Sequence, residues 1–339
     1  MKLELRFIEA PLRAPFVSAS GSLNGRRLLH VTLTGDDGVA GHGEAAPLVE
    51  LEAARGAIED CRALLAESDG ADREPLLAEC RRLAVLPAAV SAIDLALWDL
   101  AARRAAAPVW RLLGGSSGDP IAVNATIAAP DRAQASAAAD RARAEGFECV
   151  KVKVGLGDDA GRLAAVRAAL GPSIAIRLDA NGAWSVDEAI ASLRALEPVG
   201  LELCEEPVFG LEELEAVSSA TAIPISLDES AALPGALDRR VADAVCLKVS
   251  SSGGISGLLD AAARARLAGY RVYVASMLDG PLGIAAALHA CAAIRPELPC
   301  GLATLDLFDR PNPLPASRGR IAIPTGPGLG TGLDDWYHR

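Results

Sequence analysis

Aromatic side chains make up only 4% of the 339 residues, and positive charge is in the minority, since the net charge is −11. An acidic chain argues against a nucleic acid or an anionic membrane surface as a partner. No apolar run approaches the roughly 18 residues that a membrane span needs, and residues 1–6 alternate like a strand, unlike a signal peptide. We therefore expect a cytoplasmic protein with neither a nucleic-acid nor a membrane partner.

Histidine is scarce, and the seven cysteines form no C-x-x-C pair. Three of the cysteines lie in apolar stretches and predict small core residues of a reduced protein without a disulfide framework: Cys149, Cys204 and Cys246. The four histidines fall in N-terminal strands, on a late helix and in the tail, and we expect them to be structural: His30, His42, His289 and His338. Proton transfer would therefore need other side chains.

Apolar residues make up 51% of the chain, enough to bury a large α/β domain and a smaller one. Alternating stretches predict a small antiparallel sheet: 3–8, 27–33 and 38–44. Helical patterns follow: about 51–67, 72–84 and 87–106. A run of helix breakers at 114–120 then marks a boundary, so we predict an α+β domain over residues 1–115.

A loop of small residues separates the first two predicted strands. It spans Phe16–Ser22 and contains one aromatic side chain, a composition that suits a mobile lid as well as a plain connector. We take Phe16 and Ser18 as candidate substrate contacts.

From residue 121 onward, strands alternate with helices, which predicts parallel strands with right-handed crossovers. The predicted strands are 121–127, 149–153, 174–179, 201–205, 225–228, 244–249, 271–275 and 300–303. The predicted helices are 131–145, 158–170, 185–196, 211–219, 234–239, 254–268 and 281–294. Eight such strands indicate a (β/α)8 barrel over residues 116–310, with the tail 311–339 packing back on the N-terminal sheet.

Charged residues end five consecutive predicted strands, 20 to 26 residues apart: Lys153, Asp179, Glu205, Asp228 and Lys248. In a barrel these ends converge on one mouth, where barrel enzymes keep their active sites. Lys151 shares a strand face with Lys153, and we expect the two neighbouring ammonium groups to lower the pKa of at least one of them.

Three converging carboxylates repel one another unless a cation joins them, and an all-oxygen ligand set favours Mg²⁺, with Mn²⁺ as a near equivalent. A metal between lysines suits proton removal beside a carboxylate, because the cation stabilises the enolate while a lysine carries the proton. Asp94 and Asp99, on the helix at 87–106, have no partner spacing, and we interpret them as structural.

These residues resemble the enolase superfamily, in particular its muconate-lactonizing subgroup. The resemblance rests on Lys151-Val152-Lys153, residues 178–184 (LDANGAW), Glu205-Glu206-Pro207, residues 227–230 (LDES), and Lys248 followed by Gly253-Gly254. It implies an α+β capping domain on a modified barrel, with Asp179, Glu205 and Asp228 as Mg²⁺ ligands. It also implies Lys153 and Lys248 on opposite faces of a small carboxylate substrate, with Lys151 assisting electrostatically.

Within the subgroup, the chain looks most like the o-succinylbenzoate synthases, which are dehydratases of menaquinone synthesis. That likeness rests on residues 123–126 (VNAT), 275–278 (ASML) and 301–307 (GLATLDL), together with Arg177. The residues expected to contact the substrate or support the site are Asn181, Arg177, Glu206, Ser276, Thr304, Asp306, Phe16 and Ser18.

Several alternatives stay open. Dipeptide epimerases resemble one another in a D-x-D pair after the eighth strand that holds the substrate ammonium, whereas this chain has Thr304-Leu305-Asp306 there, with Asp309 nearby. We therefore favour the dehydratase over a dipeptide epimerase or an N-succinylamino acid racemase. Muconate cycloisomerase is a further relative, and a non-catalytic binding protein on this scaffold is a remote alternative. A homo-oligomer is as compatible with the sequence as a monomer.

Overall fold

The N-terminal part of the computed structural model, which describes residues 1–18, 21–115, 118–155 and 157–338, is an antiparallel sheet. Its strands are β1 (Lys2–Ser18), β2 (Gly21–Thr34) and β3 (Ala40–Ala45). The prediction of a loop over Phe16–Ser22 is wrong for the described residues, because Phe16 pairs with Leu23. β1 and β2 form a long hairpin, whose register shifts between Pro11 and Phe16. Ala19 and Ser20, in the same stretch, lie outside the described residues.

Five helices follow: α1 (Leu51–Asp60), α2 (Arg62–Ala66), α3 (Arg73–Leu83), α4 (Pro87–Arg104) and α5 (Val109–Leu112). We call β1–β3 with α1–α5 the capping domain. α4 is buried on almost every side and lies directly on β3, where a Cβ added at Gly43 would be only 2.1 Å from the carbonyl oxygen of Ala92. The glycine therefore permits the close helix–sheet contact.

Asp94 and Asp99 of α4 accept hydrogen bonds from other elements, which is consistent with the structural role that we predicted for them. Asp99 accepts hydrogen bonds from the backbone N–H groups of His42 and Leu329, and Asp94 accepts two from Ser256. The two carboxylates thus join the capping domain to distant parts of the chain.

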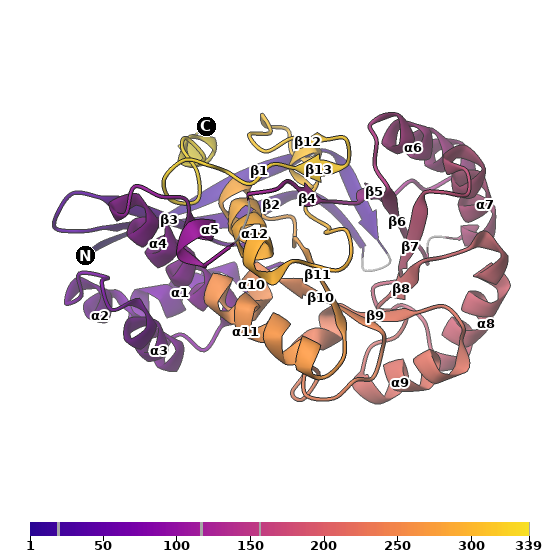
Figure 1. Ribbon diagram of the computed structural model, residues 1–339, viewed down its shortest axis with the longest axis horizontal. Coiled ribbons are helices and arrows are strands. Elements are labelled where there is room, and N and C mark those ends of the chain that lie inside the picture. Colours follow the sequence, from indigo (N-terminus) through magenta and orange to yellow (C-terminus); the bar gives the residue numbers. More distant parts are fainter. Residues whose placement is uncertain (19–20, 116–117, 156, 339) are drawn as a thin grey trace.

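The second part is a parallel sheet with the order β11-β10-β9-β8-β7-β6-β5, curled with its helices outside (Figure 1). Its strands are β5 (Ala125–Ile127), β6 (Cys149–Lys153), β7 (Ala175–Asp179), β8 (Leu203–Glu205), β9 (Ile225–Leu227), β10 (Ala244–Lys248) and β11 (Arg271–Ala275). Its helices are α6 (Arg132–Ala144), α7 (Asp159–Leu170), α8 (Val186–Leu196), α9 (Leu211–Ala220), α10 (Val249–Ser252), α11 (Gly254–Leu267) and α12 (Pro281–Ile294). This arrangement confirms the predicted modified barrel with an α+β capping domain.

The eighth strand is reduced to two bridges, Cys300 with Val123 and Gly301 with Ala275, and these join the two edges of the curled sheet. The strand expected over 121–127 divides, because β4 (Ile121–Ala122) leaves the barrel to pair with β13 (Arg320–Ile321). The helix expected over 234–239 is wrong. A six-residue segment that contains Pro234 and Gly235 at φ 80° forms turns after the short helix η2 (Glu229–Ala232) instead.

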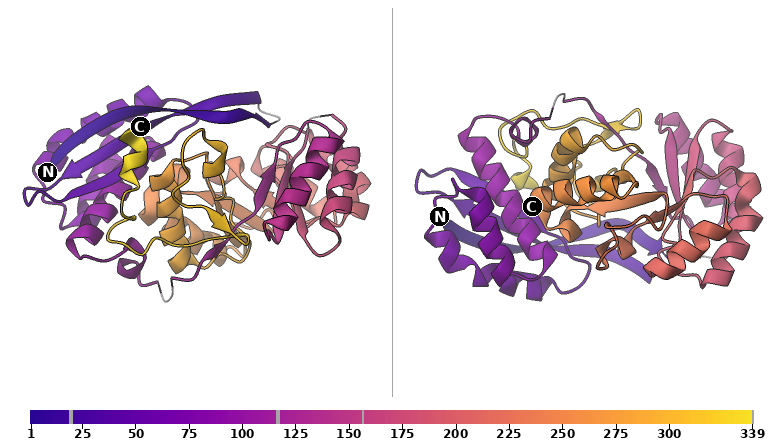
Figure 2. Two further views of the ribbon diagram at one scale, coloured as in Figure 1. Left: turned by 90° about the horizontal axis from the view of Figure 1, so that it is seen from above. Right: turned by 60° about the horizontal axis from the view of Figure 1, so that its bottom comes forward.

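The tail contacts both parts of the molecule, as Figure 2 shows. β12 (Ala316–Ser317) and β13 form a small sheet with β4, whereas Tyr337 of the terminal turn η4 (Asp334–His338) donates a hydrogen bond to Glu44 of β3. His30 stacks on Tyr337 at 4.7 Å between ring centroids. The seven cysteines are buried and free. No described helix is long and apolar enough to cross a membrane.

Glu44 should make stability depend on pH. Burial, followed by the nearby Asp279 carboxylate, raises the pKa of Glu44 from 4.5 to about 8. A carboxyl group with a raised folded-state pKa holds more protons when folded, so the free energy of unfolding should fall as pH rises between these values. Glu44→Gln should reduce this slope by up to ~1.4 kcal/mol per pH unit.

Urea unfolding at about pH 5.5 and 7.5 measures the slope for both proteins. Glu145→Gln, at an exposed position, is the matched control and should keep the wild-type slope. Equal slopes for the wild type and Glu44→Gln would contradict the prediction.

Candidate active site

A cavity of about 390 Å³ opens at the carboxyl ends of the barrel strands, under the β1–β2 hairpin. Its charged lining comprises Lys151, Lys153, Asp179, Asp228, Glu229 and Lys248. Its other lining residues include Phe16, Ser18, Leu23, Leu48, Val49, Thr126, Asn181, Ser276, Met277, Leu278 and Thr304. No histidine is among the residues that the structure places around the cavity, and the predicted Glu205 lies just beneath it.

The two lysines of β6 extend toward the acids of neighbouring strands. Lys153 Nζ lies 2.7 Å from Asp179 Oδ2 and donates to Asn181 Oδ1 at 2.9 Å. Lys151 Nζ lies 2.9 Å from both Asp179 Oδ2 and Glu205 Oε1. Burial lowers the pKa of Lys151, but the two carboxylates outweigh burial and hold this pKa well above its usual value. We expected repulsion between the two lysines to lower the pKa of at least one of them, but the pKa of Lys151 is raised.

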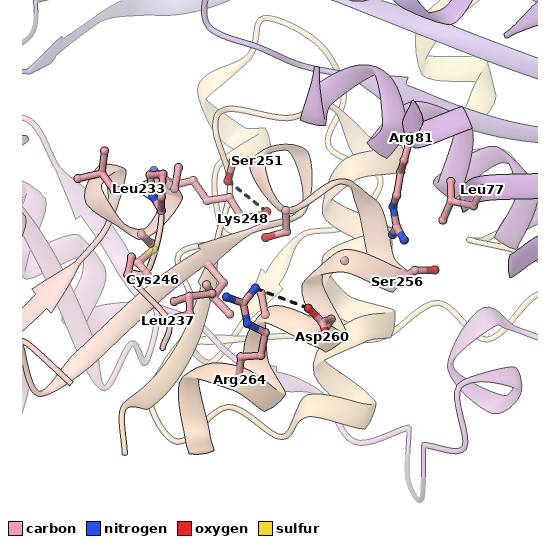
Figure 3. A pocket seen from close by; sticks show the side chains of 18 of the residues that line it. Leu77, Arg81, Leu233, Leu237, Cys246, Lys248, Ser251, Ser256, Asp260 and Arg264 are labelled. Carbon is pink, nitrogen blue, oxygen red and sulfur yellow. Dashed lines mark hydrogen bonds and ion pairs between the residues drawn. The ribbon is translucent and has the colours of Figure 1, made fainter. Parts of the chain in front are cut away.

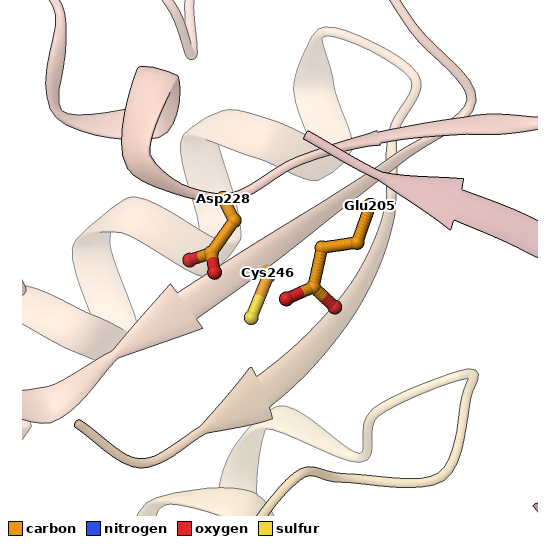
Figure 4. Close-up of side chains that lie close together, drawn as sticks. All are labelled: Glu205, Asp228 and Cys246. Carbon is orange, nitrogen blue, oxygen red and sulfur yellow. The ribbon is translucent and has the colours of Figure 1, made fainter. Parts of the chain in front are cut away.

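The three predicted metal-ligand acids are buried and close together. Glu205 and Asp228 have carboxylate oxygens within 4.8 Å of one another and of Cys246 Sγ (Figure 4). Asp179 is joined to Glu205 through Lys151. Burial raises the pKa of Glu205, Lys151 opposes it, and the carboxylates of Asp179 and Asp228 add to the rise, so that this pKa is about 7. A bound cation would stabilise the charged forms of these three carboxylates, because it offsets their mutual repulsion.

The donor atoms fit a hard divalent cation. Asp179, Glu205 and Asp228 offer carboxylate oxygens, which Mg²⁺ and Mn²⁺ prefer. Cys246 offers a soft sulfur atom, which is a poor ligand for such an ion. The carboxylate oxygens of the site thus favour Mg²⁺ or Mn²⁺.

Lys248 ends β10 on the other side of the cavity and forms an ion pair with Asp228. Burial lowers the pKa of Lys248, but Asp228 outweighs burial and raises this pKa above its usual value. The lysine also lines a second cavity on the far side of β10 (Figure 3).

The remaining predicted residues fall into two groups. Asn181, Ser276, Thr304, Phe16 and Ser18 line the cavity, and the hydroxyls of Ser276 and Thr304 lie 2.8 Å apart. The others do not line it: Glu206, Arg177 and Asp306.

Glu206 and Arg177 support the site from below. Glu206 accepts a hydrogen bond from the backbone N–H of Asp228 at 2.7 Å and so holds the loop that carries this predicted ligand. Arg177 is buried against the ring of Tyr273, whose hydroxyl donates to Glu205 at 2.7 Å. Asp306, a predicted substrate contact, is exposed on a short turn and does not line the cavity.

Sequence reasoning missed Tyr273 and Glu229 as members of the site. Glu229 lines the cavity and accepts from Asn181 at 3.2 Å. The sequence could have indicated Glu229, because it directly follows the strand-end acid Asp228. Tyr273 lies two residues before the end of β11 and so faces the barrel interior by strand alternation, a signal that was present in the pattern.

Phe16 should affect substrate binding more than chemistry, because its ring lies over Lys153 with 5.8 Å between Nζ and the ring centroid. Phe16→Ala should raise KM by ~3- to 30-fold through lost apolar contact, with a smaller change in kcat. Steady-state kinetics measures both constants. Phe209→Ala, at an exposed phenylalanine outside the cavity, is the control. A lower kcat with unchanged KM would contradict this role.

The chain matches two family domains in tandem. Residues 2–114 match the mandelate racemase / muconate lactonizing enzyme N-terminal domain, and residues 134–337 match the enolase C-terminal domain-like family. L-Ala-D/L-Glu epimerase of Bacillus subtilis is 32% identical and aligns with 97% of this chain and 96% of its own length. An o-succinylbenzoate synthase of Thermobifida fusca is 39% identical, but over 56% of this chain and 61% of its own length.

A solved structure of a dipeptide epimerase from Cytophaga hutchinsonii, complexed with Mg and the dipeptide D-Ala-L-Val, superposes with a TM-score of 0.89. It is 30% identical, and the match covers 97% of this chain and 94% of that one. Both family domains are matched in order over nearly all of the chain. The chain therefore belongs to the muconate-lactonizing subgroup of the enolase superfamily.

Proposed function

We propose that this protein is a Mg²⁺-dependent isomerase that inverts the α-carbon of an amino acid whose nitrogen is acylated, with a dipeptide as the first substrate class to test. The observation that carries the proposal is the placement of two lysines. β6 and β10 are four positions apart in a ring of eight, so Lys153 and Lys248 approach the cavity from opposite sides. Inversion needs a proton carrier on each face of the reacting carbon.

Each lysine would act in one direction of the reaction. The neutral amine of one takes the α-proton, and the electron pair moves toward the substrate carboxylate. The ammonium of the other donates a proton to the opposite face of the same carbon, which inverts the configuration. Mg²⁺ held by Asp179, Glu205 and Asp228 would offset the negative charge that develops on the carboxylate. Asn181 orients Lys153 through its 2.9 Å hydrogen bond.

The sequence motifs favour the dehydratase, because Thr304-Leu305-Asp306 lacks one acid of a D-x-D pair, whereas the relatives favour an isomerase. Relatives aligned over nearly the whole chain include two epimerases, an N-succinyl Arg/Lys racemase and a muconate cycloisomerase, whereas the o-succinylbenzoate synthase match covers little more than half of it. Glu229 also lines the cavity. Its carboxylate could accept hydrogen bonds from a substrate ammonium, in place of the acid that the D-x-D position lacks.

The test presents both kinds of substrate to the purified protein with Mg²⁺ in heavy water. One arm is a panel of L,L-dipeptides and N-succinylamino acids, followed by NMR for loss of the α-hydrogen and by chiral chromatography for inversion. The second arm is the cyclohexadiene precursor of o-succinylbenzoate, followed by its dehydration. We expect inversion of at least one panel member. Dehydration of the precursor without inversion of any panel member would overturn the proposal.

A further inference from the structure

A second cavity, of about 680 Å³, lies between the capping domain and the barrel. Two helix faces oppose each other across it (Figure 3). α3 presents Arg73, Leu77 and Arg81, each four residues apart and therefore on one side of the helix. α11 presents Ser256, Asp260 and Arg264 with the same spacing. The floor is formed by the end of β10 and by residues 231–237.

Two guanidinium groups in this cavity have no acceptor in the part of the chain that the structure describes. Within the described residues, neither Arg73 nor Arg81 takes part in a hydrogen bond or an ion pair. Arg73 is half-buried, with its Cζ stacked 3.4 Å from the ring centroid of Trp98, so its N–H edge is held in a fixed orientation. Arg81 reaches across the cavity, since a Cβ added at Gly257 of α11 would be 3.9 Å from its Nη2.

The nearby acids do not occupy these donors. Asp94 is buried and interacts electrostatically with both arginines, but its two oxygens accept from the backbone N–H and the hydroxyl of Ser256. Asp260 lies 3.9 Å from Arg264, which also pairs with Asp238 at 2.7 Å. Glu74 lies at the exposed start of α3. Arg73 is half-buried and Arg81 is exposed, so the acceptors for their donors come from solution.

We propose that this cavity binds a small organic anion through Arg73 and Arg81. A carboxylate or phosphate group matches the planar arrangement of guanidinium donors. Part of the lining is apolar, with Leu233 and Leu237 in the floor and Ala261 on α11, and suits the body of such a molecule. The site is separate from the metal-ligand acids, and the inference does not depend on the reaction proposed above. Because the ligand would contact both parts of the molecule, it would stabilise their association.

Calorimetric titration of the metal-free protein in chloride-free buffer tests the proposal, with inorganic phosphate as the first probe. We expect saturable binding that weakens at least ~10-fold in Arg73→Gln and in Arg81→Gln, since each removes a charge-assisted hydrogen-bond donor. Arg82→Gln is the matched control, because Arg82 is on the same helix, pairs with Glu79 at 3.1 Å and does not line the cavity. Phenyl phosphate and benzoate then distinguish a phosphate ligand from a carboxylate ligand.

A second measurement avoids the variants. Phenylglyoxal modifies accessible arginines, and phosphate should slow the modification of Arg73 and Arg81, measured by peptide mass spectrometry, without slowing that of Arg82. The absence of saturable binding by the wild type would overturn the proposal. Equal weakening in Arg82→Gln, or modification of Arg73 and Arg81 that phosphate leaves unchanged, would also overturn it.

Discussion

Lys153→Ala should lose epimerisation in both directions, by ~10²–10⁴-fold, because one face of the substrate loses its proton carrier. In heavy water the variant should also lose α-proton exchange from the epimer whose hydrogen faces Lys153. Exchange from the other epimer, whose hydrogen faces Lys248, should survive in part. NMR measurement of each pure epimer separates the two cases.

Lys248→Ala provides the mirror experiment and should lose exchange from the opposite epimer. Lys2→Ala is the control, since Lys2 is exposed, pairs with Glu4 and is the one lysine of this sequence outside the site. Undiminished epimerisation by Lys153→Ala would remove Lys153 from the mechanism. Loss of all exchange in Lys153→Ala, with full exchange in Lys248→Ala, would instead indicate a single proton carrier, as a dehydratase needs.

Asp228→Asn should weaken Mg²⁺ binding and lower activity by at least ~10²-fold, because a neutral amide replaces one of three charged ligands. Calorimetric titration with Mg²⁺ measures binding independently of turnover. Removing the metal with EDTA from the wild type should abolish activity, and added Mg²⁺ should restore it. The same EDTA treatment should cause no further loss in the variant.

Asp238→Asn is the matched control for this prediction. It makes the same chemical change at an exposed aspartate that pairs with Arg264, and should keep wild-type metal affinity. Thermal unfolding of both variants separates loss of the site from loss of the fold. Full turnover with unchanged Mg²⁺ affinity in Asp228→Asn would show that the ligand assignment is wrong.

The strand–helix rhythm of the barrel was readable from the sequence because each unit repeats a local pattern. A buried parallel strand needs an apolar run, and a covering helix needs a 3.6-residue period; both are local properties. α8 illustrates this, since Ser185 and Glu188 form a capping box that starts the helix where it was predicted. The hairpin around Phe16 and the turns after Pro234 were misread. The pairing that extends β1 to Ser18 depends on a partner strand, and a six-residue helix has too little local stability to form on its own.

The sequence by itself determined where the charged groups would converge, because residues at the ends of successive parallel strands must meet at one mouth. The distribution of lysine and arginine in the sequence also indicates the site. The chain contains only four lysines, and three of them are in the site, whereas arginine provides nearly all other positive charge. Arginine cannot release its proton near neutral pH, so the two proposed proton carriers, Lys153 and Lys248, could not be arginines.

Only the tertiary structure decided which groups became partners across elements. Three findings follow from how helices and strands distant in sequence pack together. Tyr273 lies beneath Glu205, Asp306 lies outside the cavity, and Arg73 and Arg81 of α3 have no acceptor among the described residues. Hydrogen bonds and ion pairs act over a few ångströms, and no local period specifies which distant side chains come within that range. The direction of a pKa shift follows the same rule, which is why the neighbouring acids, and not its own strand neighbour, decide the charge of Lys151.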